Sequence, residues 1–269
     1  MSGGLELSGL HVGYPGRPVL AGVELPAWPA GALVGLLGPN ASGKSTLLKA
    51  LAGLLPYQGT AAFAGDDLAA LPRHRRSAQV GYLPQTPPQA TGLLVYEVAL
   101  SVFRVAAPTL PRGEVERRIG EVFDLLDLNG VALSRVDTLS GGKRQLLGLA
   151  LVLARRTPLM LLDEPTSALD LRWQIEALHA IRDTLRGRGA VALVAMHDLN
   201  LALRFCDGVA VLGEGRVLAA GPAATTVTPE LLRRAYGVDA RVERCSQGHP
   251  IVVANAAATG ATWQRADAC

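Results

Sequence analysis

Gly38-Pro-Asn-Ala-Ser-Gly43-Lys44-Ser45 is the most informative segment of this 269-residue chain. It fits the pattern GxxxxGK[ST] and lies between an apolar run at 33–37 and a helix-like segment that begins near Lys44. Glycines in such a loop let backbone amides turn towards phosphate oxygens, and the start of the helix adds a partial positive charge. A chance match in a chain of this size is on the order of one per cent at the usual glycine frequency, so the segment predicts nucleotide binding.

Individual side chains of this loop have distinct expected roles. Lys44 would reach the β- and γ-phosphates, and Ser45 would bind Mg²⁺. The other residues expected to contact the nucleotide are Gly38, Asn40, Ser42, Gly43 and Thr46.

Apolar runs elsewhere in the chain predict the rest of the fold. Short runs typical of buried strands, each followed by a turn and a helical pattern, occur at 33–37, 80–83, 159–162, 191–195 and 209–212. This alternation predicts an α/β fold with a largely parallel sheet. Helices are predicted at 44–52 and at 171–186, and the side of the second that would pack carries Leu171, Ile175, Leu178 and Leu185.

The segment between Gln85 and Leu139 contains no strong strand pattern. Helix-like stretches at 97–104 and 114–128 are separated by a break at 108–113 that contains proline and glycine. This segment is therefore predicted to be an inserted helical subdomain.

Near the C-terminus a helix is predicted at 229–236, with Thr228 as its N-cap and Gly237 beyond its end, followed by a strand-like run at 251–254. The expected organisation is a single domain. The catalytic core with its β subdomain would comprise 1–85 and 146–220, and the helical subdomain 86–145. A C-terminal extension at 221–255 and a loosely held tail at 256–269 would follow.

Composition argues against several classes of protein. Hydrophobic residues make up 49% of the chain and charged residues 18%, and the net charge of +3 includes no basic block, so nucleic acid is not an expected partner. The longest apolar runs, 146–154 and 190–196, are shorter than the ~20 residues that cross a bilayer, and the start MSGGLELSG does not resemble a secretory leader. Cys206, Cys245 and Cys269 are far apart, which argues against a zinc site or a disulfide framework and fits a reducing cytoplasm.

A pair of carboxylates follows the predicted strand at 159–162, in Leu159-Met-Leu-Leu-Asp163-Glu164-Pro165. α/β sheets place their ligands at the carboxyl ends of strands. Asp163 would hold Mg²⁺, directly or through water, and Glu164 would polarise the water that attacks the γ-phosphate. A solvated strand end is the alternative, and the phosphate loop favours the catalytic interpretation.

A third motif, Leu139-Ser140-Gly141-Gly142-Lys143-Arg144-Gln145, distinguishes among phosphate-loop proteins. An ordinary N-capped turn is the alternative for this motif alone, whereas Ser140 and glycine amides at a helix N-terminus would form a second anion site. Together with the two earlier motifs, it resembles the ATP-binding cassette (ABC) family, whose signature is LSGGQ followed by a helix. The resemblance implies that a γ-phosphate bound to a second subunit is capped by Ser140, Gly141, Gly142 and Lys143.

Four weaker matches occur in the order that the family has. The resemblance implies that Tyr14 stacks on adenine, that Gln85 senses magnesium and couples to the membrane partner, and that His197 contacts the γ-phosphate. Asp170, in Ser167-Ala-Leu-Asp170, would belong to the loop that communicates across the dimer. The implied catalytic residues are Glu164, His197 and Gln85, and the implied Mg²⁺ ligands are Ser45, Gln85 and Asp163.

Two positions depart from the family pattern. Ala41 stands where glycine is usual, and Lys143 replaces the commoner glutamine of the signature. A positive φ at Ala41 would carry strain and would affect nucleotide affinity.

The resemblance covers residues 5–253 and implies an ABC-type nucleotide-binding domain. This α/β fold has a P-loop, RecA-like core, an N-terminal antiparallel β subdomain and an inserted α-helical subdomain. The resemblance also implies ATP and Mg²⁺ bound between two copies of the chain. A separate membrane permease would hold the chain at the cytoplasmic face of the inner or plasma membrane, and a periplasmic or surface substrate-binding protein would take part indirectly.

The segments 228–242 and 248–253 resemble the ATPases of ferric siderophore, haem and cobalamin importers, although 99–105 lacks the Gly-Arg-x-Pro stretch usual in that group. The expected function is ATP hydrolysis that drives such uptake. A different ABC transporter, for a metal ion or for export, or a soluble ABC ATPase without a transport role is the alternative. The permease is expected to dock on the segment 93–104, whose apolar residues are Leu93, Leu94, Val98, Val102 and Phe103. The alternative is that these residues pack inside the helical subdomain.

Overall fold

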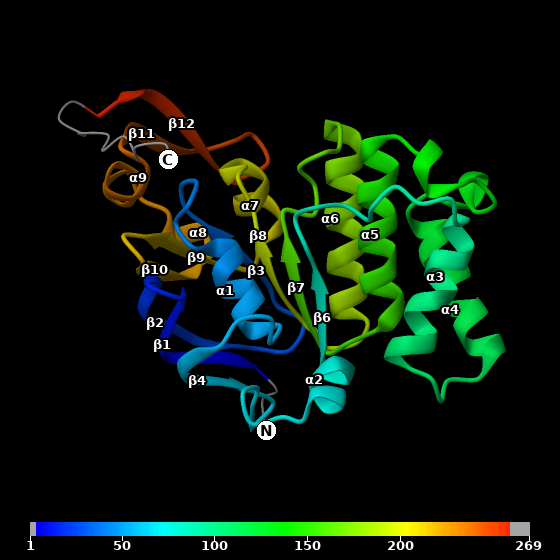
Figure 1. Ribbon diagram of the computed structural model, residues 1–269. Coiled ribbons are helices and arrows are strands. Elements are labelled where there is room, and N and C mark those ends of the chain that lie inside the picture. Colours follow the sequence, from blue (N-terminus) through cyan, green and yellow to red (C-terminus); the bar gives the residue numbers. More distant parts are fainter. Residues whose placement is uncertain (1–3, 259–269) are drawn as a thin grey trace.

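A six-stranded sheet forms the centre of the computed structural model, which describes residues 4–258 (Figure 1). Its order is β10-β9-β3-β8-β7-β6, with β3 Leu33–Leu37, β6 Val80–Leu83, β7 Leu159–Asp163, β8 Val191–Ala195, β9 Gly208–Gly213 and β10 Arg216–Pro222. The pairs β3–β8, β3–β9, β7–β8 and β6–β7 are parallel, and only the edge strand β10 runs antiparallel to its neighbour β9. The predicted α/β fold, its parallel sheet and all five predicted strands are confirmed.

Alternate residues of the central strands pack on opposite faces of the sheet. On one face, Leu33, Leu37 and Met160 join the core formed with α5 (Gly141–Arg155), α6 (Leu171–Arg186) and α7 (Leu199–Phe205). On the other, Val34 and Leu159 join the core formed with α1 (Lys44–Leu51) and the N-terminal strands. Since both faces are covered, the central strands are apolar throughout and were recognisable as continuous runs.

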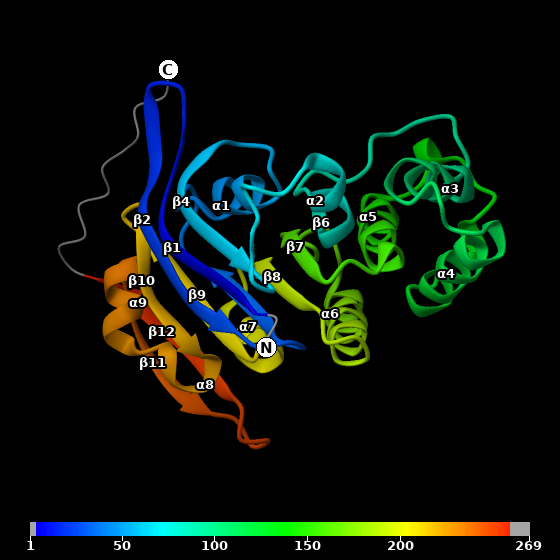
Figure 2. The same ribbon diagram turned by 90° about the horizontal axis from the view of Figure 1, so that it is seen from below.

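A second, four-stranded antiparallel sheet confirms the expected N-terminal β subdomain. Its order is β2-β1-β4-β5, with β1 Leu5–Tyr14, β2 Arg17–Trp28, β4 Tyr57–Phe63 and β5 Asp66–Asp67. Figure 2 shows β1 and β2 as a long hairpin beside β4. The short helix α2 (Arg73–Gln79) then leads into β6.

The predicted helical insertion contains α3 (Val95–Ala106) and α4 (Arg112–Leu125), followed by 3₁₀ turns at Asn129–Val131 and Val136–Thr138. Both helices contact α5, and Figure 1 places them on the far side of α5 from the sheet. Val95, Ala99 and Phe103, spaced four residues apart, form the buried face of α3. Phe103 is only 2% exposed, so the expectation that it belongs to a docking surface is wrong: it fills the core between α3, α4 and α5.

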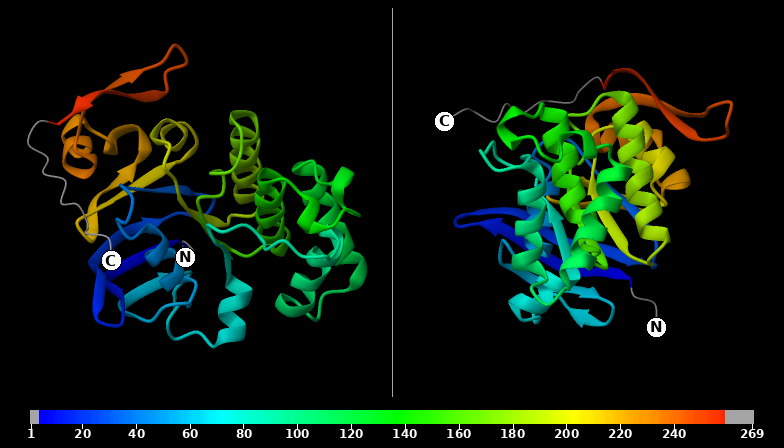
Figure 3. Two further views of the ribbon diagram at one scale, coloured as in Figure 1. Left: turned by 45° about the horizontal axis from the view of Figure 1, so that its top comes forward. Right: turned by 90° about the vertical axis from the view of Figure 1, so that its right-hand side faces the viewer.

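The C-terminal extension contains α8 (Ala223–Thr226), α9 (Pro229–Tyr236) and the antiparallel pair β11 (Val238–Arg244) and β12 (Pro250–Ala257). Figure 3 (left) shows this hairpin on the side of the main sheet away from α3 and α4. The ends of α9 are those predicted: Thr228 Oγ1 accepts a hydrogen bond from the Leu231 amide (3.2 Å), and Gly237 is left-handed with φ 64°. Strand β12 reaches Ala257, beyond the expected run, and residues 259–269 of the expected tail lie outside the described residues.

The predicted packing side of α6 needs one correction. Leu178 and Leu185 are buried and Ile175 is partly buried, but Leu171 is 66% exposed. Leu171 is the first residue after the N-cap Asp170, and side chains of a helix lean towards its N-terminus. Its side chain therefore extends past the end of the core.

None of the helices within residues 4–258 combines the length and the apolar character needed to cross a membrane.

Candidate active site

The phosphate loop connects β3 to α1 in a backbone conformation that requires its glycines. Gly38 (φ 142°) and Gly43 (φ 101°) both have positive φ. A Cβ atom on Gly38 would lie 2.4 Å from the Leu212 carbonyl oxygen, and one on Gly43 would lie 2.5 Å from a methyl carbon of Leu20. Ala41 also has positive φ, at 60°, so the strain expected from its departure from glycine is present.

A cavity of about 520 Å³ opens over this loop. Its lining residues come from the β subdomain, the phosphate loop and the ends of three central strands: Tyr14, Arg17, Val19, Asn40, Ala41, Ser42, Gly43, Lys44, Ser45, Thr46, Gln85, Glu164 and His197. The fold thus brings together most of the residues predicted for nucleotide binding and catalysis. Arg17 and Val19 were not predicted; they reach the cavity because β2 pairs with β1 beside Tyr14.

Lys44 is buried and already positioned by the loop itself. Its Nζ donates hydrogen bonds to the carbonyl oxygens of Gly38 (2.7 Å) and Pro39 (3.0 Å). Burial lowers the pKa of Lys44, and the nearby carboxylates of Glu164 and Asp163 act in the opposite direction. A bound phosphate would give this ammonium group a stronger anionic partner than the two carbonyls.

Asp163 ends β7 beside the phosphate loop. Its Oδ1 accepts a hydrogen bond from Ser45 Oγ (3.0 Å), while its buried Oδ2 has no hydrogen-bond partner within residues 4–258. Burial also raises the pKa of Asp163. A hydroxyl beside a carboxylate with an unpaired oxygen is a donor set that suits Mg²⁺. Gln85 lines the same cavity as Ser45. Ser45 and Asp163, two of the three predicted Mg²⁺ ligands, therefore fit such an ion, and Gln85 as the third ligand stays a prediction.

Glu164 points towards a different partner from its neighbour. Its Oε1 lies 2.5 Å from Nε2 of His197, which is a hydrogen-bonding distance. Glu164 has φ 52°, an unfavourable conformation for a non-glycine residue, and its amide donates to the Ala195 oxygen on the adjacent strand (3.2 Å). This backbone turn separates the two carboxylates, so that one can serve a metal ion and the other a water molecule.

The signature residues Ser140 to Lys143 do not line the cavity of their own chain. Ser140 caps α5, where its Oγ accepts from the Lys143 amide (3.3 Å). Lys143 Nζ bonds to Asp127 through its carbonyl (2.6 Å) and carboxylate (3.1 Å) and lies 5.0 Å from the ring centroid of Trp173. Asp170 likewise caps α6, accepting from the Trp173 amide (2.9 Å).

Gln145 is a site-associated residue that the sequence analysis missed. It is 1% exposed, and its Nε2 donates to the carbonyl oxygen of Glu164 (3.0 Å). The signature helix is thereby bonded directly to the backbone of the proposed catalytic carboxylate. The signal in the sequence that could have identified Gln145 is that it is a polar residue directly before the apolar run at 146–154.

The phosphate loop, the paired carboxylates at a strand end and the surrounding α/β sheet define a P-loop nucleotide-binding protein. Residues 26–167 match the family described as ABC transporter, and this chain belongs to that family as an ATP-binding ATPase.

Known proteins similar to this chain agree with that assignment. A hemin import ATP-binding protein of Bordetella pertussis is 38% identical over 247 residues, which cover 88% of this chain and 94% of that protein. A cobalamin import ATP-binding protein of Halobacterium salinarum is 38% identical over 242 residues, 88% of this chain and 59% of that one. The solved structure of an ATP binding subunit of an ABC transporter superposes with a TM-score of 0.72 at 28% identity, covering 88% of this chain and 94% of that chain.

Proposed function

We propose that this chain is the ATP-hydrolysing subunit of an importer, and that it energises uptake of an iron chelate, haem or cobalamin through a separate membrane permease. The named relatives support the substrate class, because a hemin and a cobalamin import ATP-binding protein are both 38% identical to this chain over 88% of its length. The observation that carries the proposed ATP hydrolysis is that Lys44, Glu164 and His197 line one and the same cavity.

In the proposed mechanism, the loop amides and Lys44 bind the β- and γ-phosphates, and Tyr14 supports the adenine ring at the outer end of the cavity. Glu164 polarises the attacking water, and His197 holds the Glu164 carboxylate in place through their hydrogen bond. Mg²⁺ held by Ser45, Asp163 and Gln85 would neutralise charge on the β- and γ-phosphates.

A second copy of the chain would complete each site. Because Ser140, Gly141 and Gly142 lie outside the cavity of their own chain, their amides can serve only a nucleotide bound elsewhere. In the proposed homodimer each ATP lies between the phosphate loop of one subunit and the signature of the other, with Asp170 at the contact between them.

The permease would dock at a groove rather than along the whole of α3. A groove of about 420 Å³ directly follows Gln85 and is lined by Tyr82, Leu83, Pro84, Thr86, Pro87, Pro88, Gln89, Val102, Gly148, Leu151, Val152 and Arg155. Of the five positions first expected to dock, only Val102 lines it. Such docking would hold the chain at the cytoplasmic face of the membrane. The permease would receive its cargo from a substrate-binding protein at the opposite face.

Transport by the reconstituted complex tests this function. The chain would be placed in proteoliposomes with ATP, a candidate permease and its substrate-binding protein, and uptake of labelled ferric siderophore, haem and cobalamin would be measured. ATP-dependent accumulation of one of these is expected, with Lys44→Ala as the inactive control. ATP-dependent movement of only a simple metal ion, or outward movement, would support the other transporter classes instead.

A further inference from the structure

The C-terminal extension contacts the phosphate loop through one side chain. Tyr236, the last residue of α9, accepts a hydrogen bond on its Oη from the amide of Gly38 (2.7 Å). Burial raises the pKa of Tyr236 to about 12, so the hydroxyl is neutral at any working pH. The two residues are 198 positions apart in the sequence.

This contact holds the first residue of the loop, Gly38. The amide of Gly38 is bound by Tyr236, and its carbonyl oxygen accepts the hydrogen bond from Lys44 Nζ (2.7 Å). Gly38 therefore links the extension to the ammonium group that the proposed function assigns to the nucleotide phosphates. Tyr236 does not line the cavity, so it can influence the nucleotide only through the loop.

A second contact joins the extension to the other side of the site. On β12, the amide of Val252 donates to Asn200 Oδ1 (2.7 Å), and the Val252 carbonyl accepts from Asn200 Nδ2 (3.4 Å). Asn200 lies in the first turn of α7, three residues after His197, and this helix is capped by Asp198. The amide side chain thus binds β12 in the way that a neighbouring strand would.

The extension is anchored well enough to transmit these constraints. Leu232 of α9 is buried in the main core, and Val238 and Val252 pack against the same core. An ion pair between Arg233 and Asp239 (2.6 Å) joins α9 to β11. Figure 1 shows the extension lying along β9, β10 and α7, at the end of the molecule that carries the phosphate loop.

We propose that the C-terminal extension, residues 223–258, is a clamp that fixes the position of the phosphate loop relative to the segment that carries His197. Tyr236 is the positioning residue for Gly38, and Asn200 is the second anchor. The proposal rests on the proposed function in one respect: the cavity must be where ATP binds. It assigns to the extension a role in nucleotide affinity and turnover that depends on no contact with ATP.

Removal of a single oxygen tests the first anchor. Tyr236→Phe leaves the Gly38 amide unpaired, and the expected result is a rise of about 3- to 10-fold in both the KM for ATP and the Kd for a non-hydrolysable analogue, with kcat nearly unchanged. Tyr57→Phe is the matched control, because Tyr57 is a partly buried tyrosine whose hydroxyl has no hydrogen-bond partner within the described residues. Equal nucleotide affinity in the two variants and the wild type would overturn the role of Tyr236.

The second anchor predicts the opposite kinetic pattern. Asn200→Ala should lower kcat about 3- to 10-fold with little change in KM, because it loosens the helix that follows His197. Asn255→Ala is the control and should be neutral, because within the described residues the Asn255 side chain has a hydrogen bond only with the exposed Arg241. An Asn200→Ala variant that matches this control in kcat would overturn the second anchor.

Lys44→Ala separates the two levels of the proposal. If Lys44→Ala loses analogue binding while Tyr236→Phe and Asn200→Ala behave like their controls, the nucleotide site stands and the clamp is refuted. If Lys44→Ala binds the analogue like the wild type, the nucleotide site itself is in the wrong place, and the clamp proposal fails with it.

Discussion

Neighbouring carboxylates with opposite surroundings are the central feature at the scale of single residues. Asp163 is buried and bonded to Ser45, whereas Glu164 lies in a strained backbone conformation and faces His197. Because these environments differ, substitution of each acid by its amide should have a different consequence.

Glu164→Gln should leave nucleotide binding intact and reduce turnover by at least about 100-fold, since the amide keeps the shape of the side chain but cannot polarise water in the same way. Single-turnover hydrolysis and analogue titration on the same preparation would measure both quantities. Hydrolysis within a few-fold of the wild type would exclude Glu164 as the general base.

Asp163→Asn should stabilise the nucleotide-free protein while removing the extra stability that Mg²⁺-ATP confers. Burial raises the pKa of Asp163, which means that its charged form is penalised in the folded state, and an asparagine could still accept from Ser45. A gain of about 1 kcal/mol would raise the melting temperature by roughly 2–4 °C.

The pH dependence of this gain has a defined sign. Since the folded-state pKa of Asp163 lies above its ordinary value of 3.8, protonation favours the folded wild type. The advantage of the asparagine variant should therefore be full at neutral pH and shrink as the pH falls through the folded-state pKa towards 3.8. Melting curves at several pH values, without nucleotide, would measure it. A constant difference at every pH would mean that the buried charge is not its cause.

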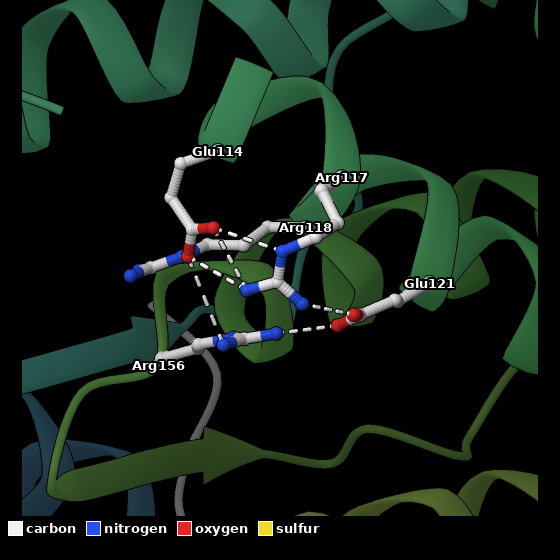
Figure 4. Close-up of polar contacts among 5 residues, drawn as sticks. All are labelled: Glu114, Arg117, Arg118, Glu121 and Arg156. Carbon is white, nitrogen blue, oxygen red and sulfur yellow. Dashed lines mark hydrogen bonds and ion pairs between the residues drawn. The ribbon is translucent and has the colours of Figure 1, made fainter. Parts of the chain in front are cut away.

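Ion pairs join helices α4 and α5 at the scale of secondary-structure elements. Arg156, the C-cap of α5, pairs with Glu121 and Glu114 of α4, and Glu114 also binds Arg117 and Arg118 (Figure 4). All of these side chains are partly exposed, so the network is expected to contribute little per pair. Arg156 also has φ 59°, which costs a non-glycine residue about 1 kcal/mol.

These two contributions can be separated by substitution. Arg156→Ala loses the ion pairs but keeps the unfavourable backbone conformation, so it should destabilise the protein by about 0.5–1 kcal/mol. Arg156→Gly loses the same pairs and removes the backbone cost, so it should be close to neutral. Urea denaturation at low and high salt would measure both, and the loss in the alanine variant should shrink with salt. A glycine variant as unstable as the alanine variant would show that packing, not backbone strain, dominates there.

Elements with a strong one-dimensional signal were predictable from the sequence. The central strands are continuous apolar runs because helices or strands cover both faces, and α9 has a threonine cap and a terminal glycine. β11 was not predicted, because its segment Val238–Arg244 is mostly polar and does not show the apolar run of a buried strand. This strand pairs with β12 in a two-stranded sheet. The limits of β1 and β2 were equally hidden, because register shifts interrupt the alternation of buried and exposed residues.

The candidate site divides in the same way. Residues to which a motif assigns a role were predicted. Gln145, which ends the signature motif without an assigned role, and Tyr236 act instead through hydrogen bonds to backbone atoms of Glu164 and Gly38, which are 19 and 198 positions away in the sequence. A side chain that binds a backbone atom elsewhere in the chain leaves no recognisable sequence pattern, because the partner residue can be of any type.

In the proposed homodimer, each chain as a whole molecule would contribute half of each of two sites. The phosphate loop opens onto its own cavity, while Ser140 at the start of α5 is not among the residues that line this cavity. In a symmetric dimer, each composite site would take Lys44 from one subunit and Ser140 from the other.

Mixing two inactive variants tests this composite geometry. Ser140→Arg blocks the anion site at the start of α5, and Lys44→Ala removes the phosphate contact; each homodimer then has no intact site. In a mixed dimer, one site combines Lys44 of the first variant with Ser140 of the second and is complete, while the other site carries both defects. Random pairing of equal amounts makes half of the dimers mixed, so the mixture should recover up to about a quarter of the wild-type ATPase activity if the sites are independent. No recovery at any ratio, or recovery well above that level, would contradict a shared site, because one intact composite site per mixed dimer is all that the geometry allows.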